Sequence, residues 1–158
     1  HSKPFEFDDD YAAAPGMRRM LTGTGPILGL IALESALDVF ETVDMAEVRR
    51  KSVALSRLFL HRVDIACAGH GLEPVTSLPP EQRGSHVALR HPQGYAIMQA
   101  LIRRHVIGDF RAPDVIRFGL TPLYLRYQDV WDAVDTLAEV LGSGEWRSAD
   151  FRARALVT

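Results

Sequence analysis

The stretch SHVALRHPQGYAIMQALIRR, residues 85–104, decides the fold class because its hydrophobic period changes part-way along. Residues 85–91 alternate between apolar and polar side chains, as a strand does when one of its faces is buried. The apolar residues that follow recur at helical spacing: Tyr95, Met98, Leu101 and Ile102. A strand that leads directly into an amphipathic helix predicts a domain in which helices pack on a sheet.

Three further short segments have strand character on either side of this stretch. Residues 72–78, LEPVTSL, alternate in the same way, and the turn-rich segment PPEQRG separates them from residues 85–91. Further along, VIGDF and DVIRF flank the proline turn RAPD. We therefore expect a small, mostly antiparallel sheet. Its strands should lie near residues 73–77, 84–91, 106–110 and 114–118.

Three other segments have helical periodicity. One begins at Pro26, and because apolar residues cover most of its faces, we expect this helix to be nearly buried. A second opens at a capping box in residues 44–47 and ends at Gly69 and Gly71. The last covers about residues 127–141. The order helix, helix, strand, strand, helix, strand, strand, helix predicts a two-layer α+β fold.

The chain divides by composition near residue 43. Residues 1–24 lack helical periodicity and carry the acidic cluster DDD followed by AAAPG, which is typical of an extended connecting segment. We expect residues 1–43 to form a connecting arm with an interface helix. Residues 44–158 should then form a small α+β domain with its own hydrophobic core.

Composition and spacing exclude several classes of function. The net charge of −2 and the pI of about 6.3 provide no basic field for nucleic acid or an anionic membrane. The single cysteine, Cys67, rules out an internal disulfide, and we expect it to be a buried hydrophobic residue. The histidines lack metal-ligand spacing, so no metal site is predicted. The longest apolar stretch contains Glu34 and Asp38 and is too short for a bilayer, which favours a cytoplasmic protein.

The segment LTGTGPIL, residues 21–28, is the first candidate site. Gly23 and Gly25 flank Thr24 immediately before a helix, so backbone N–H groups and a hydroxyl can meet an anion there. Alternatively, the glycines form a turn in which Thr24 simply caps the helix. The residues alone leave both interpretations open.

Arg117 is the second candidate, because it lies in the otherwise apolar segment DVIRF. Its guanidinium is suited to a bidentate grip on a carboxylate. In a strand it shares a face with Val115 and with Gly119, whose missing side chain leaves room for a ligand. The alternative is a structural ion pair with Asp109 or Asp114, which are close in the sequence. Spacing does not decide between these two roles.

Five segments carry a family resemblance: FEFDDDYAAAPGMRRMLTGTGPILGLIALESALDVFE, MAEVRRKSVALSRLF, RGSHVALRH, VIGDFRAPDVIRFGLTPLY and DVWDAV. Together they resemble the C-terminal part of bacterial kynureninases, and the likeness runs through nearly the whole chain. The resemblance implies the aspartate-aminotransferase fold (fold type I), a homodimer and the cofactor pyridoxal 5'-phosphate. It also implies hydrolysis of L-kynurenine, or 3-hydroxykynurenine, to anthranilate, or 3-hydroxyanthranilate, and L-alanine. That reaction belongs to tryptophan catabolism and NAD biosynthesis.

The resemblance also implies a role for each candidate residue. Thr24 would be a cofactor-binding residue that contacts the phosphate in the other subunit's site, and Arg117 would hold the α-carboxylate of the substrate. The family's cofactor-binding lysine would precede His1, and neither Lys3 nor Lys51 matches its motif. We therefore expect no catalytic residue in this chain. Alone, it should bind pyridoxal phosphate weakly or not at all and should not cleave kynurenine.

Two other interpretations fit the same order of elements. One is the small domain of another fold-type-I enzyme, such as a cysteine desulfurase, although Cys67 lies on a helix and not in a loop where a persulfide can form. The other is a free-standing α+β ligand-binding module, for instance a regulatory sensor of amino acids. Cofactor absorbance in the longer protein, and none in this chain, would separate an enzyme part from a sensor.

Overall fold

The computed structural model describes the chain except for residues 1, 4, 7–8, 22, 77–78 and 154–158. The chain forms two compact units, His1–Val43 and Asp44–Thr158, and each is described by itself. In the part of the chain that is described, no helix is both long enough and apolar enough to cross a membrane.

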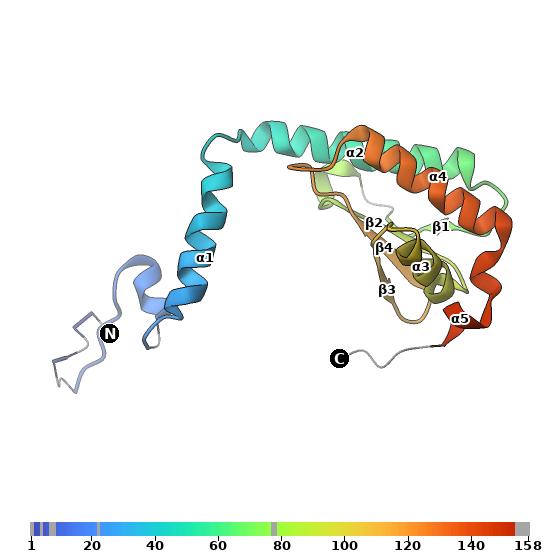
Figure 1. Ribbon diagram of the computed structural model, residues 1–158. Helices are drawn as coiled ribbons and strands as arrows, with labels where there is room; N and C mark the ends of the chain where they lie inside the picture. The colour runs from blue at the N-terminus through green and yellow to red at the C-terminus, as the bar shows by residue number, and fades with distance from the viewer. Residues whose placement is uncertain (1, 4, 7–8, 22, 77–78, 154–158) are drawn as a thin grey trace. The chain divides into compact units, whose positions relative to one another are not determined.

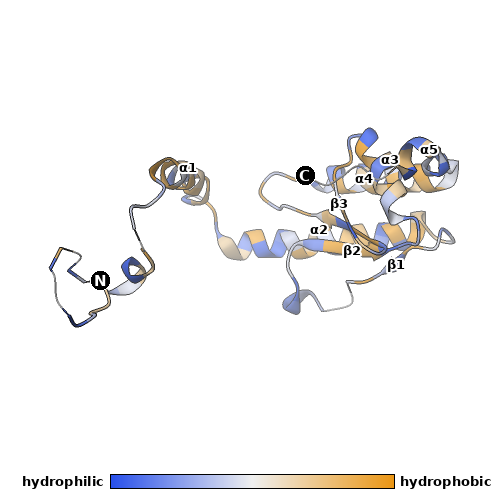
Figure 2. Ribbon diagram, turned by 90° about the horizontal axis from the view of Figure 1, so that it is seen from below, coloured by the Kyte–Doolittle hydropathy of each residue, from blue (hydrophilic) through white to orange (hydrophobic). Residues whose placement is uncertain are grey.

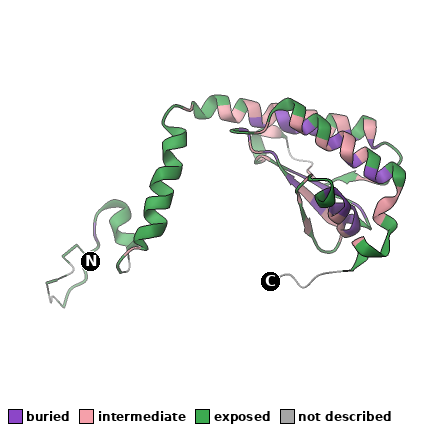
Figure 3. Ribbon diagram, viewed as in Figure 1, coloured by how far each residue is buried: buried purple, intermediate pink, exposed green. Residues whose placement is uncertain are grey.

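The first unit is built around one helix. A 3-10 turn, η1 (Gly16–Met20), is followed by α1 (Ile27–Leu37) and by a second 3-10 turn, η2 (Asp38–Phe40). In Figure 2, where α1 is seen nearly end-on, its ribbon has mostly the colour of hydrophobic residues, and Figure 3 shows the helix exposed throughout. The expectation that this helix is nearly buried is therefore wrong within this chain. A helix that is apolar all round needs partners on every side, and none of its residues is buried here.

The second unit places three long helices on a four-stranded sheet (Figure 1). The elements are α2 (Met45–Ala66), β1 (Glu73–Pro74), η3 (Pro80–Gln82), β2 (His86–Arg90), α3 (Gly94–Arg103), β3 (Asp109–Arg111), β4 (Val115–Gly119), α4 (Tyr127–Ser143), η4 (Glu145–Arg147) and α5 (Ala149–Arg152). The strand order is β1-β2-β4-β3, and all neighbouring strands are antiparallel. The predicted α+β class and the antiparallel sheet are confirmed.

Local sequence explains where α2 begins. Asp44 is the N-cap, and its side chain accepts a hydrogen bond from the Ala46 N–H at 2.8 Å. Glu47, the other half of the predicted capping box, forms an ion pair with Arg50 one turn further along α2. The helix ends at Ala66 with Cys67 as its C-cap, and the chain then turns through Gly69 and Gly71, whose φ angles are positive at 80° and 74°.

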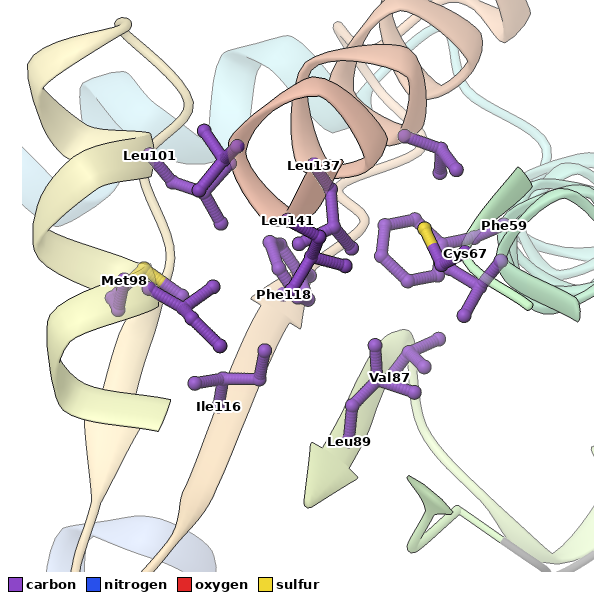
Figure 4. Close-up of a cluster of buried hydrophobic side chains, with 14 of the residues drawn as sticks. Phe59, Cys67, Val87, Leu89, Met98, Leu101, Ile116, Phe118, Leu137 and Leu141 are labelled. Carbon is purple, nitrogen blue, oxygen red and sulfur yellow. The ribbon is translucent and has the colours of Figure 1, made fainter. Parts of the chain in front are cut away.

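The hydrophobic core lies on one face of the sheet only. Alternate residues of β2 and β4 point to this face, and they pack against α2, α3 and α4 (Figure 4). Phe118 of β4 contacts Phe59 of α2, with ring centroids 4.9 Å apart. The labelled core residues in Figure 4 are Phe59, Cys67, Val87, Leu89, Met98, Leu101, Ile116, Phe118, Leu137 and Leu141. In the described part of the chain, no helix covers the opposite face of the sheet, which we call the open face.

Candidate functional site

The open face carries Arg117 at its centre. The register pairs Arg117 of β4 with Ala88 of β2 on one side and with Asp109 of β3 on the other. Because Ile116 and Phe118 point into the core, the pleat places Arg117 on the opposite face. Its side chain keeps 33% of its surface exposed, so β4 holds a guanidinium at the surface and not in the interior.

Asp109 binds Arg117 through one edge of the guanidinium. Nε of Arg117 donates to Oδ1 of Asp109 at 2.7 Å, and Nη2 donates to Oδ2 at 2.6 Å. These two parallel hydrogen bonds form the side-on bidentate geometry that favours arginine over lysine. Of the two carboxylates that the sequence offered as partners, the structure selects Asp109, and Asp114 pairs with Arg90 at 3.4 Å.

The charges around Asp109 keep it ionised. The hydrogen bonds from Arg117 lower the pKa of the Asp109 carboxyl, and the positive charges of Arg117 and Arg111 and the nearby His86 lower it further. Partial burial acts in the opposite direction and is outweighed. The same pair raises the pKa of Arg117 above its ordinary value. The open face thus holds a stable ion pair with a second arginine beside it, since Arg111 lies 3.8 Å from Asp109.

The other edge of the Arg117 guanidinium is available. Among the described residues, none forms a hydrogen bond with Nη1 of Arg117, which leaves the edge formed by Nη1 and the second hydrogen of Nη2. Ala88 and Gly119, next to Arg117 on this face, are small, and His86 lies opposite Gly119. Ala88 lies across from Arg117, and a Cβ added at Gly119 would meet no atom within 4 Å. A ligand carboxylate therefore has both a donor pair and space at Arg117.

Gly108 is a residue of this site that the sequence analysis did not single out. A Cβ at Gly108 would lie 2.5 Å from the carbonyl oxygen of Arg117 and 2.7 Å from Cε of Met98. Only glycine therefore lets the chain approach β4 closely enough to bring Asp109 opposite Arg117. The available signal was an isolated glycine inside the strand-like segment VIGDF, which is typical of close backbone approach.

Thr24 lies in the other unit, immediately before α1. Its side chain is exposed, and Pro26 is the N-cap of α1 with no side-chain hydrogen bond to the first turn. The interpretation in which Thr24 caps this helix is therefore not supported. A Cβ added at the preceding Gly23 would meet nothing within 4 Å, so there is open space at Gly23 beside Thr24. Thr24 and Arg117 belong to different units of the chain.

A pocket of about 500 Å³ lies at the end of β4 on the helix-covered side of the sheet, where Gly119 forms part of its wall. Its floor contains Phe59 and Phe118, and its rim contains Tyr124. The remaining wall is mixed, because the exit of α3 and the first turns of α4 contribute both charged and apolar side chains. Arg117 does not line this pocket, because its side chain points to the other face of the sheet.

Cys67 and the acidic and histidine side chains show which other kinds of site this chain could hold. Burial raises the pKa of the Cys67 thiol to about 11; the nearby Arg62 opposes this shift and Asp135 adds to it. Cys67 is therefore a protonated core residue, which argues against a persulfide-forming role. Among the described residues, no group of three or more histidine, cysteine or acidic side chains is arranged to hold a metal ion.

The chain is similar to known proteins along its whole length. A family model described as "Kynureninase C-terminal domain" matches residues 48–137. Curated kynureninases from Burkholderia mallei (strain SAVP1) and Burkholderia pseudomallei (strain K96243) are each 48% identical to this chain over all 158 residues. The kynureninase of Pseudomonas fluorescens is 49% identical over the same length. The chain spans 38% of the length of these relatives.

Proposed function

This chain belongs to the family of kynureninase C-terminal domains, and from that membership we propose that it is the C-terminal part of a cytoplasmic, pyridoxal-phosphate-dependent hydrolase. The complete enzyme would cleave L-kynurenine, or its 3-hydroxy derivative, with water to give the anthranilate product and L-alanine. The observation that carries the proposal in this chain is the open face. There a half-exposed arginine presents an unused donor edge beside two small residues.

Arg117 has the binding role in this proposal. Its free edge donates two hydrogen bonds to the α-carboxylate of kynurenine. This bidentate contact fixes the orientation of the amino-acid end of the substrate. The same contact holds the three-carbon fragment that leaves as alanine. Lysine in this place would keep the charge but would lose the second hydrogen bond.

The residues of this chain account for only part of a cofactor site. Thr24 and the neighbouring backbone N–H groups are suited to phosphate oxygens at the start of α1. Neither lysine lies beside Thr24 in the sequence: Lys3 forms an ion pair with Glu6 at 2.8 Å, and Lys51 lies on α2. The cofactor supplies an electron sink for charge at the substrate α-carbon, and we place its lysine outside this chain.

We also place α1 at an interface between two subunits. Thr24 directly precedes α1, and in this proposal Thr24 reaches the phosphate site of the partner subunit. The helix carries large apolar side chains that are exposed in this chain, among them Leu28 with 84% of its surface accessible. A second copy that covers them would stabilise the dimer through burial of apolar surface.

Kinetics of the full-length enzyme test the function directly. Arg117→Ala should lower kcat/KM for kynurenine on the order of a hundredfold or more, because the carboxylate is desolvated without its partner. Arg117→Lys should keep the fold and raise KM. A near-normal kcat/KM in Arg117→Ala would reduce Arg117 to a structural ion-pair residue.

The isolated chain provides the complementary test. Incubation with pyridoxal phosphate followed by borohydride should leave no stoichiometric adduct at a single lysine, and kynurenine should yield no anthranilate. Calorimetric titration with kynurenine and with common amino acids checks the sensor alternative. Saturable micromolar binding of an amino acid by the isolated chain would favour a free-standing binding module.

A further inference from the structure

We propose that Asp109 is a positioning residue for substrate binding, because it grips the side edge of the Arg117 guanidinium and leaves the end edge presented to the α-carboxylate. This inference rests on the proposed function, in which Arg117 binds that carboxylate. It assigns a role to a residue that touches neither substrate nor cofactor.

The Arg117 guanidinium has two edges that can each bind a carboxylate. A guanidinium offers one bidentate edge at Nε and Nη2 and another at Nη1 and Nη2. Asp109 uses the first of these edges, with distances of 2.7 and 2.6 Å. In the described part of the chain, the second edge has no partner, so Arg117 can bind Asp109 and a ligand carboxylate at the same time. Asp109 is therefore a support for substrate binding and not a competitor.

The sheet fixes Asp109 in this place. The register aligns Asp109 with Arg117 and Phe110 with Ile116. Phe110 also packs edge-on against Tyr95 of α3, with ring centroids 5.6 Å apart. A shift of β3 by one residue would turn Phe110 to the open face and remove Asp109 from it. The core contacts of β3 thus hold the carboxylate opposite Arg117 before any ligand arrives.

Positioning of this kind has a clear physical benefit. A free arginine side chain has four rotatable bonds, and ordering it on binding costs free energy. Asp109 already restricts the side chain, so a carboxylate that binds to the second edge orders less of it. Arg111, 3.8 Å from Asp109, balances the charge of the carboxylate, so the pair does not repel an incoming anion.

Steady-state kinetics of the full-length enzyme test the proposal through the split between KM and kcat. Asp109→Ala should raise KM for kynurenine about tenfold, equivalent to roughly 1.4 kcal/mol, with kcat within about threefold of the original. Asp109→Asn should give an intermediate KM, because one acceptor oxygen remains. Asp114→Asn is the matched control, since it removes an aspartate–arginine pair that joins the β3–β4 turn to Arg90 of β2, and its KM should stay within about twofold.

Two further measurements separate positioning from a merely structural role. A kynurenine analogue with hydrogen in place of the α-carboxylate, used as a competitive inhibitor, should bind Asp109→Ala and the original enzyme equally well. In a double-mutant cycle, adding Asp109→Ala to Arg117→Ala should raise KM no further, because Asp109 acts only through Arg117.

The outcomes distinguish the positioning role of Asp109 from the carboxylate-binding role of Arg117. If Arg117→Ala raises KM while Asp109→Ala leaves it unchanged or lowers it, positioning is wrong and the carboxylate-binding role of Arg117 stands. If Arg117→Ala itself leaves KM unchanged, both are wrong. Equal weakening of kynurenine and of the carboxylate-free analogue by Asp109→Ala would assign Asp109 to folding alone.

Discussion

At the scale of single residues, His91 links folding to pH. It is buried to 9% exposure at the end of β2, its Nδ1 accepts a hydrogen bond from the Gln93 N–H at 2.9 Å, and its ring lies edge-on against Trp146. Burial lowers the pKa of His91 below its ordinary value, against a smaller opposing effect from a hydrogen bond with the backbone of His70. The folded chain therefore favours neutral His91, which is the form that can accept at Nδ1.

The sign of the resulting pH dependence follows from proton uptake. As pH falls through the ordinary histidine pKa of 6.5, the unfolded chain binds a proton at His91 before the folded chain does. The free energy of unfolding should therefore fall between about pH 7.5 and 5.5. Urea unfolding at several pH values measures it, with His91→Asn as the control that retains an acceptor but does not titrate. An equally steep pH dependence in His91→Asn would assign the effect to other groups.

Thr24 provides a second prediction at this scale. In the dimeric enzyme, its hydroxyl would donate a charge-assisted hydrogen bond to the cofactor phosphate, worth about 1.5–3 kcal/mol. Thr24→Ala should weaken cofactor retention by part of that amount, because the backbone N–H remains, and Thr24→Pro should weaken it more. Dialysis against cofactor-free buffer, followed by absorbance of the retained cofactor, measures both. Unchanged affinity in both variants would end the phosphate role.

At the scale of elements, the β3–β4 pair depends on Gly108. In Gly108→Ala, the new Cβ would meet backbone and the Met98 side chain at distances that neither can accept without moving. We expect a loss of about 1–3 kcal/mol in the free energy of unfolding, measured by urea titration. Gly119→Ala is the matched control, because its Cβ has open space, and it should change stability by less than about 0.5 kcal/mol. Similar effects of the two substitutions would contradict close approach at Gly108.

The strands of this sheet show which boundaries could be predicted from the sequence and which could not. The alternation in residues 85–91 and 114–118 was sufficient for β2 and β4, because one face of each strand is buried. The strand expected at 106–110 begins only at Asp109. Its first residues instead form the exit of α3, where His105 adopts a φ of 65° and the Val106 N–H bonds to the Leu101 carbonyl at 3.0 Å. Local periodicity does not reveal such a competing bond.

The ion-pair partner of Arg117 also could not be predicted from the sequence alone. The sequence offered Asp109 and Asp114, which lie within eight positions of Arg117. The choice depends on the strand register, and the register is fixed by packing of Phe110 against α3 and by the missing side chain of Gly108. These are tertiary contacts, so spacing along the chain could name the candidates but not choose between them.

At the scale of the whole molecule, the exposure of α1 predicts how subunits associate. Leu28→Glu should weaken the proposed dimer of the full-length enzyme, because a carboxylate would be buried among apolar side chains. Light scattering coupled to gel filtration over a dilution series measures the dissociation. Ile107→Glu is the matched control, since Ile107 is 81% exposed and belongs to the other unit. A dimer that resists Leu28→Glu as well as Ile107→Glu would place the interface elsewhere.

Because the sheet is packed on one face only, its two sets of side chains can change independently during evolution. Along β4, the even-numbered residues Ile116 and Phe118 belong to the core, and the odd-numbered residues Val115, Arg117 and Gly119 belong to the open face. A substitution at Gly119 should therefore alter the open face with little effect on the packed core. A designer who wants a different substrate can vary Gly119 beside a fixed Arg117 and leave the even positions of β4 untouched.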